Sequence, residues 1–164
     1  MERISIHLDS NVTLSALKAG AGDPLIMIPG WSQSSEEWKG SAASLSAVRE
    51  VIALDMRGHG ESDKPDYGYR VYRLAQDLHE TINKLEFPTV DLMAHSMGCS
   101  VIWAYIDLYG QDRIGRLVLV DQAPCMFPRA EWSPEEMEQF GCFYKSADEV
   151  DELAASAMDC VDLD

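Results

Sequence analysis

The sequence predicts an α/β fold built on a doubly wound, mostly parallel sheet. Short apolar runs recur along the chain, and runs of this kind are typical of strands buried on both faces. Segments of helical composition or spacing separate them, and such alternation favours parallel strands joined by helical crossovers. A serine also stands between one apolar run and a helical pattern, in Ala94-His-Ser-Met-Gly98. The runs are Pro24–Ile28, Glu50–Leu54, Val90–Ala94 and Arg116–Val120.

A hairpin is predicted before the first buried run. Residues Ile4–Leu8 and Val12–Lys18 alternate between apolar and polar side chains, and Asp9-Ser-Asn11 between them has turn chemistry. His7 lies on the polar side of the alternation, so we expect an exposed strand residue there.

The run Pro24–Ile28 leads into a glycine-containing loop, Pro29-Gly-Trp-Ser-Gln-Ser-Ser35. Backbone N–H groups of such a loop can face a ligand, and the alternative is a simple strand-to-helix turn. The segment Glu36–Val48 has helical composition, with Ser35 as a candidate cap.

The run Glu50–Leu54 leads into a loop, residues 55–65, rich in glycine and charge. His59 lies between two glycines; we interpret it as a brace for the loop, with a catalytic base as the alternative. The apolar spacing from Val71 to Leu85 then predicts an amphipathic helix, and His79 falls off its apolar stripe, so we expect it to face solvent.

The Ser96 stretch has the strand, tight turn and helix that a nucleophile elbow needs. Gly98 and Ala94 are small, as so sharp a turn demands, and the Met97 N–H would lie near the helix start. The alternative is a serine that caps a helix. Four residues nevertheless fall just past carboxyl ends of predicted strands, where ligands of such sheets bind: Trp31, Arg57, Ser96 and Asp121.

Composition excludes several classes of partner. The net charge of −15 argues against nucleic acid and anionic membrane surfaces. The four cysteines form no Cys-x-x-Cys pair, so no metal site is expected, and Cys99 is interpreted as a core residue. The start of the chain lacks the apolar block of a signal peptide, and we expect a cytoplasmic protein.

Two parts are predicted along the chain: a core over 1–124 and an acidic helical segment over 125–164. From Glu131 onward, eleven acidic residues stand against Lys145 alone. Capping-box patterns at Ser133 and Ser146 indicate short helices there.

Three motifs, in this order, closely resemble the α/β-hydrolase superfamily, nearest its esterase and cofactor-free haloperoxidase-like branch. They are Ile28-Pro-Gly-Trp31, Asp55-Met-Arg-Gly-His-Gly-Glu-Ser62 and Ala94-His-Ser-Met-Gly98, and the likeness covers Ile4 to about Pro124. The resemblance implies a serine hydrolase acting on an ester-like bond of a small acyl substrate. It implies that Ser96 is the nucleophile, that Trp31 and Met97 supply the oxyanion hole, and that 125–164 begins a helical cap.

No metal or organic cofactor is implied. His95, Met126 and Trp132 are candidates for the substrate pocket. Serine rather than Asp at position 96 looks unlike the dehalogenase and epoxide hydrolase branches of the superfamily.

The sequence departs from the family pattern at three points. Pro29 stands where the family usually has His, and Ala94 replaces a glycine. The family's catalytic His and its usual acid follow later strands that this sequence lacks, and none of its four histidines matches that position. Asp121 is a candidate acid, with a structural role as the alternative.

We therefore expect an amino-terminal portion of a serine hydrolase with little activity of its own. The alternatives are a non-catalytic binding or interaction protein that keeps the pocket, and a truncated gene product. Without the last two strands of the family, one side of Arg116–Val120 should remain unpaired, which is an association hazard. We expect the acidic helices or another chain to cover this edge, or poor solubility to result, and self-association through the edge is one of these outcomes.

Overall fold

The computed structural model describes residues 1–122 and 132–135. The chain divides into two compact units, Met1–Gln122 and Ala123–Asp164. The strands β1–β6 and the helical segments η1 and α1–α3 all lie in the first unit. The predicted acidic cap segment falls almost wholly outside the described residues and stays a prediction.

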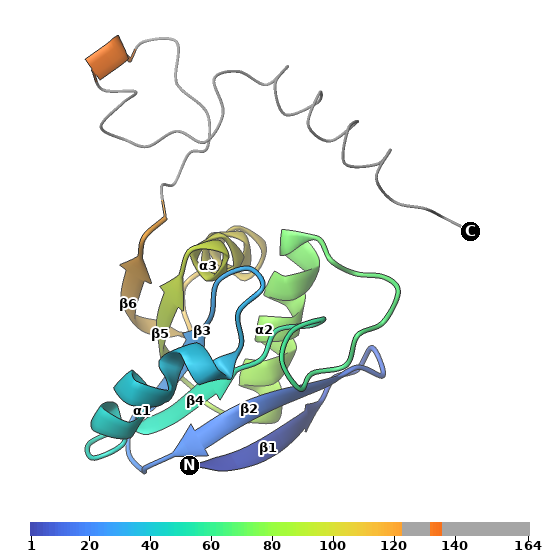
Figure 1. Ribbon diagram of the computed structural model, residues 1–164, viewed down its shortest axis with the longest axis vertical. Helices are drawn as coiled ribbons and strands as arrows, with labels where there is room; N and C mark the ends of the chain where they lie inside the picture. The colour runs from blue at the N-terminus through green and yellow to red at the C-terminus, as the bar shows by residue number, and fades with distance from the viewer. Residues whose placement is uncertain (123–131, 136–164) are drawn as a thin grey trace. The chain divides into compact units, whose positions relative to one another are not determined.

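The first unit is a six-stranded sheet with the strand order β1-β2-β4-β3-β5-β6. The β1–β2 and β2–β4 pairs are antiparallel, whereas β4, β3, β5 and β6 run parallel. The carboxyl ends of these four strands therefore share one edge (Figure 1). The strands are β1 Glu2–His7, β2 Thr13–Ala19, β3 Pro24–Ile28, β4 Glu50–Leu54, β5 Val90–His95 and β6 Ile114–Val120.

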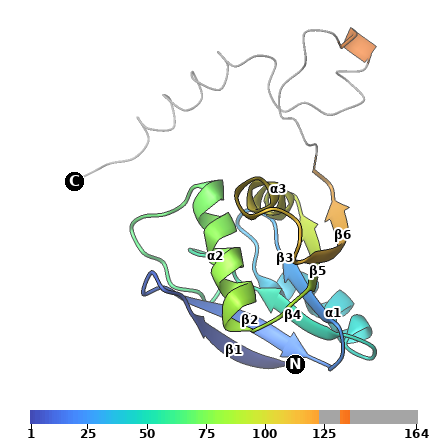
Figure 2. The same ribbon diagram turned by 180° about the vertical axis from the view of Figure 1, so that it is seen from behind.

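Helices cover both faces of the sheet (Figures 1 and 2). The alternation within β3 divides the core: Ile26 and Ile28 join the apolar cluster under α2 and α3, while Leu25 and Met27 join the cluster with α1. Within the described ranges, no helix has the length and apolar content that crossing a bilayer requires. The helical segments are η1 Ser35–Trp38, α1 Lys39–Leu45, α2 Val71–Lys84 and α3 Met97–Tyr109.

The predicted α/β architecture is confirmed, and β3 and β4 have the predicted bounds. The predicted hairpin forms, and Asn11 in its turn has a φ of 57°. The helix after the elbow ends before Gly110, whose φ of 74° is the left-handed conformation that commonly stops a helix.

The segment expected as one helix over 36–48 is instead a short 3₁₀ turn, η1, followed by α1. Its cap is Ser34, whose side chain accepts from the Glu36 N–H, rather than Ser35. Ser35 is instead the first residue of η1, where it is fully buried and its N–H donates to Asp55 Oδ1 at 2.6 Å.

The expectation for His79 was wrong. Its ring stacks on Tyr109 with the centroids 3.9 Å apart, so it packs between α2 and α3 rather than facing solvent. Burial lowers its pKa below the ordinary value. His7 is exposed, as predicted.

The strand β6 differs from the buried strand that its composition predicts. Its side chains from Leu117 to Val120 are each 37–48% exposed. Among the described residues β6 pairs only with β5, so nothing there covers its outer edge. The unpaired side that the sequence predicted is therefore present in the described part of the fold, and self-association through it stays a prediction.

Candidate active site

Ser96 lies at the junction of β5 and α3, at the carboxyl edge of the sheet. Its φ of 47° and ψ of −121° are far from helical values, and a non-glycine residue is strained in such a conformation. Two backbone bonds hold it: the Ser96 N–H donates to the Val120 carbonyl at 2.9 Å, and the Ser96 carbonyl accepts from Cys99 at 2.8 Å. The predicted strained turn between strand and helix is confirmed.

Small residues let the turn approach the neighbouring strand. A methyl group on Gly98 would lie 2.7 Å from the Ile28 carbonyl oxygen and 2.8 Å from that of Pro29. Ala94 is fully buried on the preceding strand. The first turn of α3 therefore contacts the end of β3 directly, and position 98 accepts no side chain without movement.

The loop after β3 also lies close to Ser96. A methyl group on Gly30 would lie 3.4 Å from the Ser96 Cβ, so the two backbones are in close contact. The Gln33 N–H donates to the Gly30 carbonyl at 3.3 Å, which closes a tight turn, and Ser32 within it has a φ of 60°. Trp31 is 73% exposed at the outside of this turn.

Two backbone donors beside Ser96 remain available. The Gly30 N–H donates to the side chains of Gln33 and Glu37, at 3.2 and 3.3 Å. In residues 1–122 and 132–135, no group accepts from the N–H of Trp31 or Met97. Met97 is the first residue of α3, where helix N–H groups lack an internal partner and positive partial charge collects. These are the donors predicted for an oxyanion hole, and that role stays a prediction.

His95 is turned toward the loop after β3 rather than toward Ser96. Its Nδ1 lies 2.6 Å from Glu37 Oε1 and 3.0 Å from Gln33 Oε1, and its Nε2 lies 3.8 Å from Asp121 Oδ2. Asp121, at the end of β6, has a φ of 54° and a side chain that is 88% exposed. The candidate acid thus faces a histidine that does not contact the candidate nucleophile.

The other histidines also lie apart from Ser96. His7 contacts Thr13 in the hairpin, at 3.0 Å. His59 donates from Nδ1 to the Arg57 carbonyl at 2.9 Å, which confirms its interpretation as a loop brace. His79 packs on Tyr109 as described. Since the sequence has four histidines and all lie in the described part, none of them is placed to take the Ser96 proton.

The charged loop after β4 is a structural support. Asp55 accepts from the Glu61 N–H at 3.0 Å and from Arg3 Nη1 at 3.0 Å, besides the Ser35 bond. The Ser62 hydroxyl donates to the Asp55 carbonyl at 2.6 Å. One carboxylate thus connects β1, the loop after β3 and the loop after β4.

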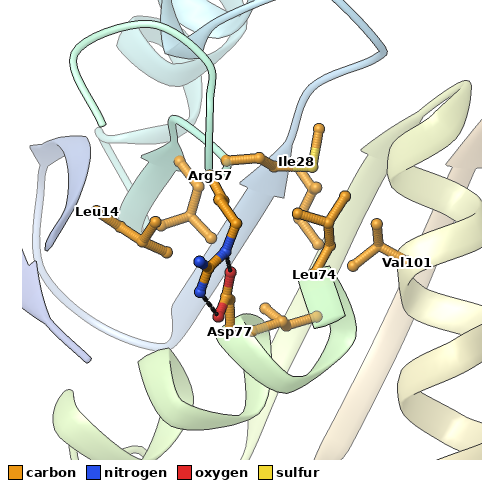
Figure 3. A pocket seen from close by; sticks show the side chains of 9 residues that line it. Leu14, Ile28, Arg57, Leu74, Asp77 and Val101 are labelled. Carbon is orange, nitrogen blue, oxygen red and sulfur yellow. Dashed lines mark hydrogen bonds and ion pairs between the residues drawn. The ribbon is translucent and has the colours of Figure 1, made fainter. Parts of the chain in front are cut away.

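Arg57 does not reach the ligand edge, contrary to the expectation from its position after β4. It is fully buried and donates to both oxygens of Asp77 on α2, at 2.8 and 2.9 Å (Figure 3). The hydrogen bonds to Asp77 raise its pKa, so it is permanently charged. The cavity beside the pair leaves about 10 Å³ in which the centre of a water molecule could lie. This is close to the minimum for one water molecule and too small for a substrate.

Sequence reasoning missed Gln33 and Glu37, the two residues that connect the loop to His95. Their residue types beside a helix start are typical of ordinary surface positions, so no sequence signal marks them. Met126 lies outside the described residues, and Trp132 belongs to the second unit, so their pocket roles stay predictions. Within the described ranges, no three side chains of His, Cys, Asp or Glu gather as a metal site requires.

Known proteins match this chain in sequence. The α/β hydrolase fold family matches residues 23–163. A putative non-heme chloroperoxidase of Synechocystis sp. is 33% identical over 121 residues, which are 73% of this chain and 44% of that protein. A soluble epoxide hydrolase of Corynebacterium sp. is 34% identical over 116 residues, 71% of this chain and 40% of that protein.

Solved structures show the same architecture. An esterase from Exiguobacterium antarcticum aligns with a TM-score of 0.76 and 26% identity, over 94% of this chain and 55% of that one. The chain spans less than half the length of the two curated relatives. With the family matched over most of its length, and with the strand order and elbow described above, the chain belongs to the α/β-hydrolase fold family.

Proposed function

We propose that this chain carries the nucleophile and oxyanion donors of a serine hydrolase that acts on ester-like bonds of small acyl substrates. The observation that supports this most is the backbone of Ser96, strained at φ 47° and ψ −121° between a parallel strand and a helix. Strain of this kind persists where it presents a side chain for chemistry. The Trp31 and Met97 N–H groups supply donors at the same edge.

In the proposed reaction, Ser96 Oγ attacks the carbonyl carbon and its proton passes to a base. The carbonyl oxygen becomes an oxyanion, which the N–H groups of Met97 and Trp31 stabilise because they are oriented before the charge develops. The intermediate then expels the alcohol and leaves an acyl group on Ser96. Water, activated by the same base, hydrolyses this ester and restores the hydroxyl.

None of the four histidines of this chain is placed to act as the general base of this reaction. A serine hydroxyl is a weak nucleophile without one, and removing the base of a serine protease costs about 10⁶-fold in kcat. An oxyanion hole and substrate binding alone leave roughly 10³-fold over water. The proposed activity of this chain by itself is therefore a Ser96-dependent rate barely above background.

The second candidate is a non-catalytic binding protein that keeps the pocket. It is favoured by the placement of His95, which faces Glu37 and Asp121 instead of Ser96. An epoxide-opening activity, which the name of one relative suggests, is disfavoured by serine at the nucleophile position.

The test is turnover of p-nitrophenyl acetate by the chain, by Ser96→Ala and by His7→Ala, which removes an exposed histidine as a matched control. We expect a small rate above buffer that Ser96→Ala abolishes and His7→Ala leaves unchanged. An excess rate that survives Ser96→Ala contradicts the proposal. No excess rate, together with saturable binding of acyl compounds, favours the binding protein.

A further inference from the structure

We infer that His95 and Glu37 are positioning residues that hold the Pro29–Gly30 peptide against Ser96 and so set the position of one oxyanion donor, the next N–H along the loop, which is that of Trp31. This inference rests on the proposed function. It concerns residues that touch neither the substrate carbonyl nor the Ser96 hydroxyl.

The two oxygens of Glu37 connect the backbone of the loop after β3 with the His95 side chain. Oε2 accepts from the Gly30 N–H at 3.3 Å, and Oε1 lies 2.6 Å from His95 Nδ1. Carboxylate and amide oxygens both accept hydrogen bonds, so the Nδ1–H of His95 is the donor to Glu37 Oε1. Gln33 Oε1 accepts from the same two donors, at 3.2 Å from Gly30 N and 3.0 Å from His95 Nδ1.

This arrangement fixes the loop relative to the nucleophile because His95 is the residue directly before Ser96. The loop and the elbow lie close together. A methyl group added at Gly30 would lie only 3.1 Å from His95 Nδ1 and 3.4 Å from Ser96 Cβ. With the Gly30 N–H bound to side chains, the Pro29–Gly30 peptide cannot rotate freely. The Gly30 carbonyl accepts from the Gln33 N–H at 3.3 Å, which restrains the next peptide. Among the described residues nothing accepts from the N–H of that peptide, which belongs to Trp31, so it is a free donor that this loop contributes beside the Met97 N–H.

The network lies at the edge of the site rather than in the core. The side chains of His95 and Glu37 are 24% and 20% exposed, and neither belongs to the apolar clusters of the sheet. Asp121 at 3.8 Å from Nε2 adds a third strand end, that of β6. Apolar packing elsewhere holds the sheet together. We therefore interpret the polar contacts that join the ends of β3, β5 and β6 as fixing the positions of these strand ends around Ser96.

The test uses 4-fluorophenylboronic acid and ¹⁹F NMR. Ser96 Oγ adds to boron, its proton passes to solvent, and the four-coordinate boronate carries the negative charge that the oxyanion donors bind. The variants are paired. Glu37→Ala is compared with Glu37→Gln, which keeps the length: its amide oxygen can accept from the Gly30 N–H, and its amide nitrogen can donate to Nδ1 of the other His95 tautomer. His95→Ala is compared with His95→Asn, whose amide nitrogen can replace the Nδ1 donor. The ¹H–¹⁵N shift of the Trp31 amide is recorded for each variant without ligand.

We expect the Ser96-dependent adduct to weaken about tenfold or more in both Ala variants, because displacing an oxyanion donor by about 1 Å is costly. Glu37→Gln and His95→Asn should stay within about threefold of the parent, and only the Ala variants should shift the Trp31 amide. Gln33→Ala removes the amide oxygen that accepts from both Gly30 and His95, so it should also weaken the adduct. This variant still tests the inference if Glu37→Ala or His95→Ala does not fold.

Outcomes against the inference are distinct from those against the function. If Ser96→Ala abolishes the adduct but the Glu37 and His95 variants bind like the parent, the positioning role is wrong and the proposed function stands. The role is equally wrong if the Gln and Asn variants lose as much as the Ala variants. If the parent forms no Ser96-dependent adduct, the proposed function fails and the inference with it.

Discussion

Replacing Gly98 by alanine tests how closely the elbow must approach β3. The added methyl would lie 2.7 and 2.8 Å from two backbone carbonyl oxygens, below the 3.0 Å that real Cβ contacts respect. These oxygens belong to Ile28, the last residue of β3, and to the residue that follows it, and β3 is paired on both sides, so α3 has to move instead. Overpacking of this kind costs about 1–3 kcal/mol. Alanine gains up to about 1 kcal/mol over glycine in a helix, which offsets only part of that cost.

Gly40→Ala is the matched control. Gly40 is the second residue of α1 as Gly98 is of α3, and a methyl there meets nothing within 4 Å. This variant should gain helix propensity alone and be as stable as the parent or more so. The two variants should therefore differ by about 1–3 kcal/mol in the free energy of unfolding, or about 4–12 °C in Tm.

Urea titration followed by circular dichroism measures both variants under one set of conditions. Equal midpoints for Gly98→Ala and Gly40→Ala, with equal slopes, would refute the reasoning. Such a result would mean that α3 shifts away from β3 at no cost, and that the close approach does not hold the turn.

Three further predictions follow from the structure. Ser96→Gly should stabilise the fold by about 1–2 kcal/mol relative to Ser96→Ala, measured by urea titration, because glycine adopts the positive φ without strain. Burial raises the pKa of Asp91, but donation from the Arg116 N–H and from Arg49 outweighs it and holds the pKa below the ordinary 3.8. The folded-state pKa is thus depressed, so the advantage of the parent over Asp91→Asn should be present above pH 3.8 and shrink as the pH falls below it, in unfolding experiments at several pH values. Val118→Lys should reduce any concentration-dependent association in sedimentation, since lysine on an exposed strand edge opposes pairing, and unchanged association would place the contact elsewhere.

Much of this fold could be predicted because local pattern and tertiary environment agree. Pro24–Ile28 is apolar throughout and Glu50–Leu54 is apolar after Glu50. Both lie between other strands with helices on both faces, so composition predicts their bounds. The Ser96 turn was predictable because small residues flank the serine between a strand and a helix pattern. These are features that neighbouring residues determine.

The misses share a different cause, which is contact between residues distant in sequence. The local pattern favours Ser35 as a cap, and nothing in it reveals that this residue is buried with its N–H bound to Asp55, 20 residues away. His79 was placed in solvent because its partner, Tyr109, lies on another helix. The link from Glu37 to His95 joins segments that a reading along the chain treats separately. Partners across the fold decide such polar positions, and residue type alone does not identify them.

The carboxylate of Asp55 has a consequence for reading mutational data on this protein. It is 1% exposed and joins Arg3, the Ser35 N–H and the Glu61 N–H, which come from three separate stretches of the chain. Losing it would release the loop that carries Trp31 at its far end. In a saturation scan scored by activity, position 55 would therefore score as intolerant as Ser96, although it touches no reacting atom. Only a parallel scan scored by abundance would separate the two, because a lost nucleophile leaves the folded protein intact and a lost support does not.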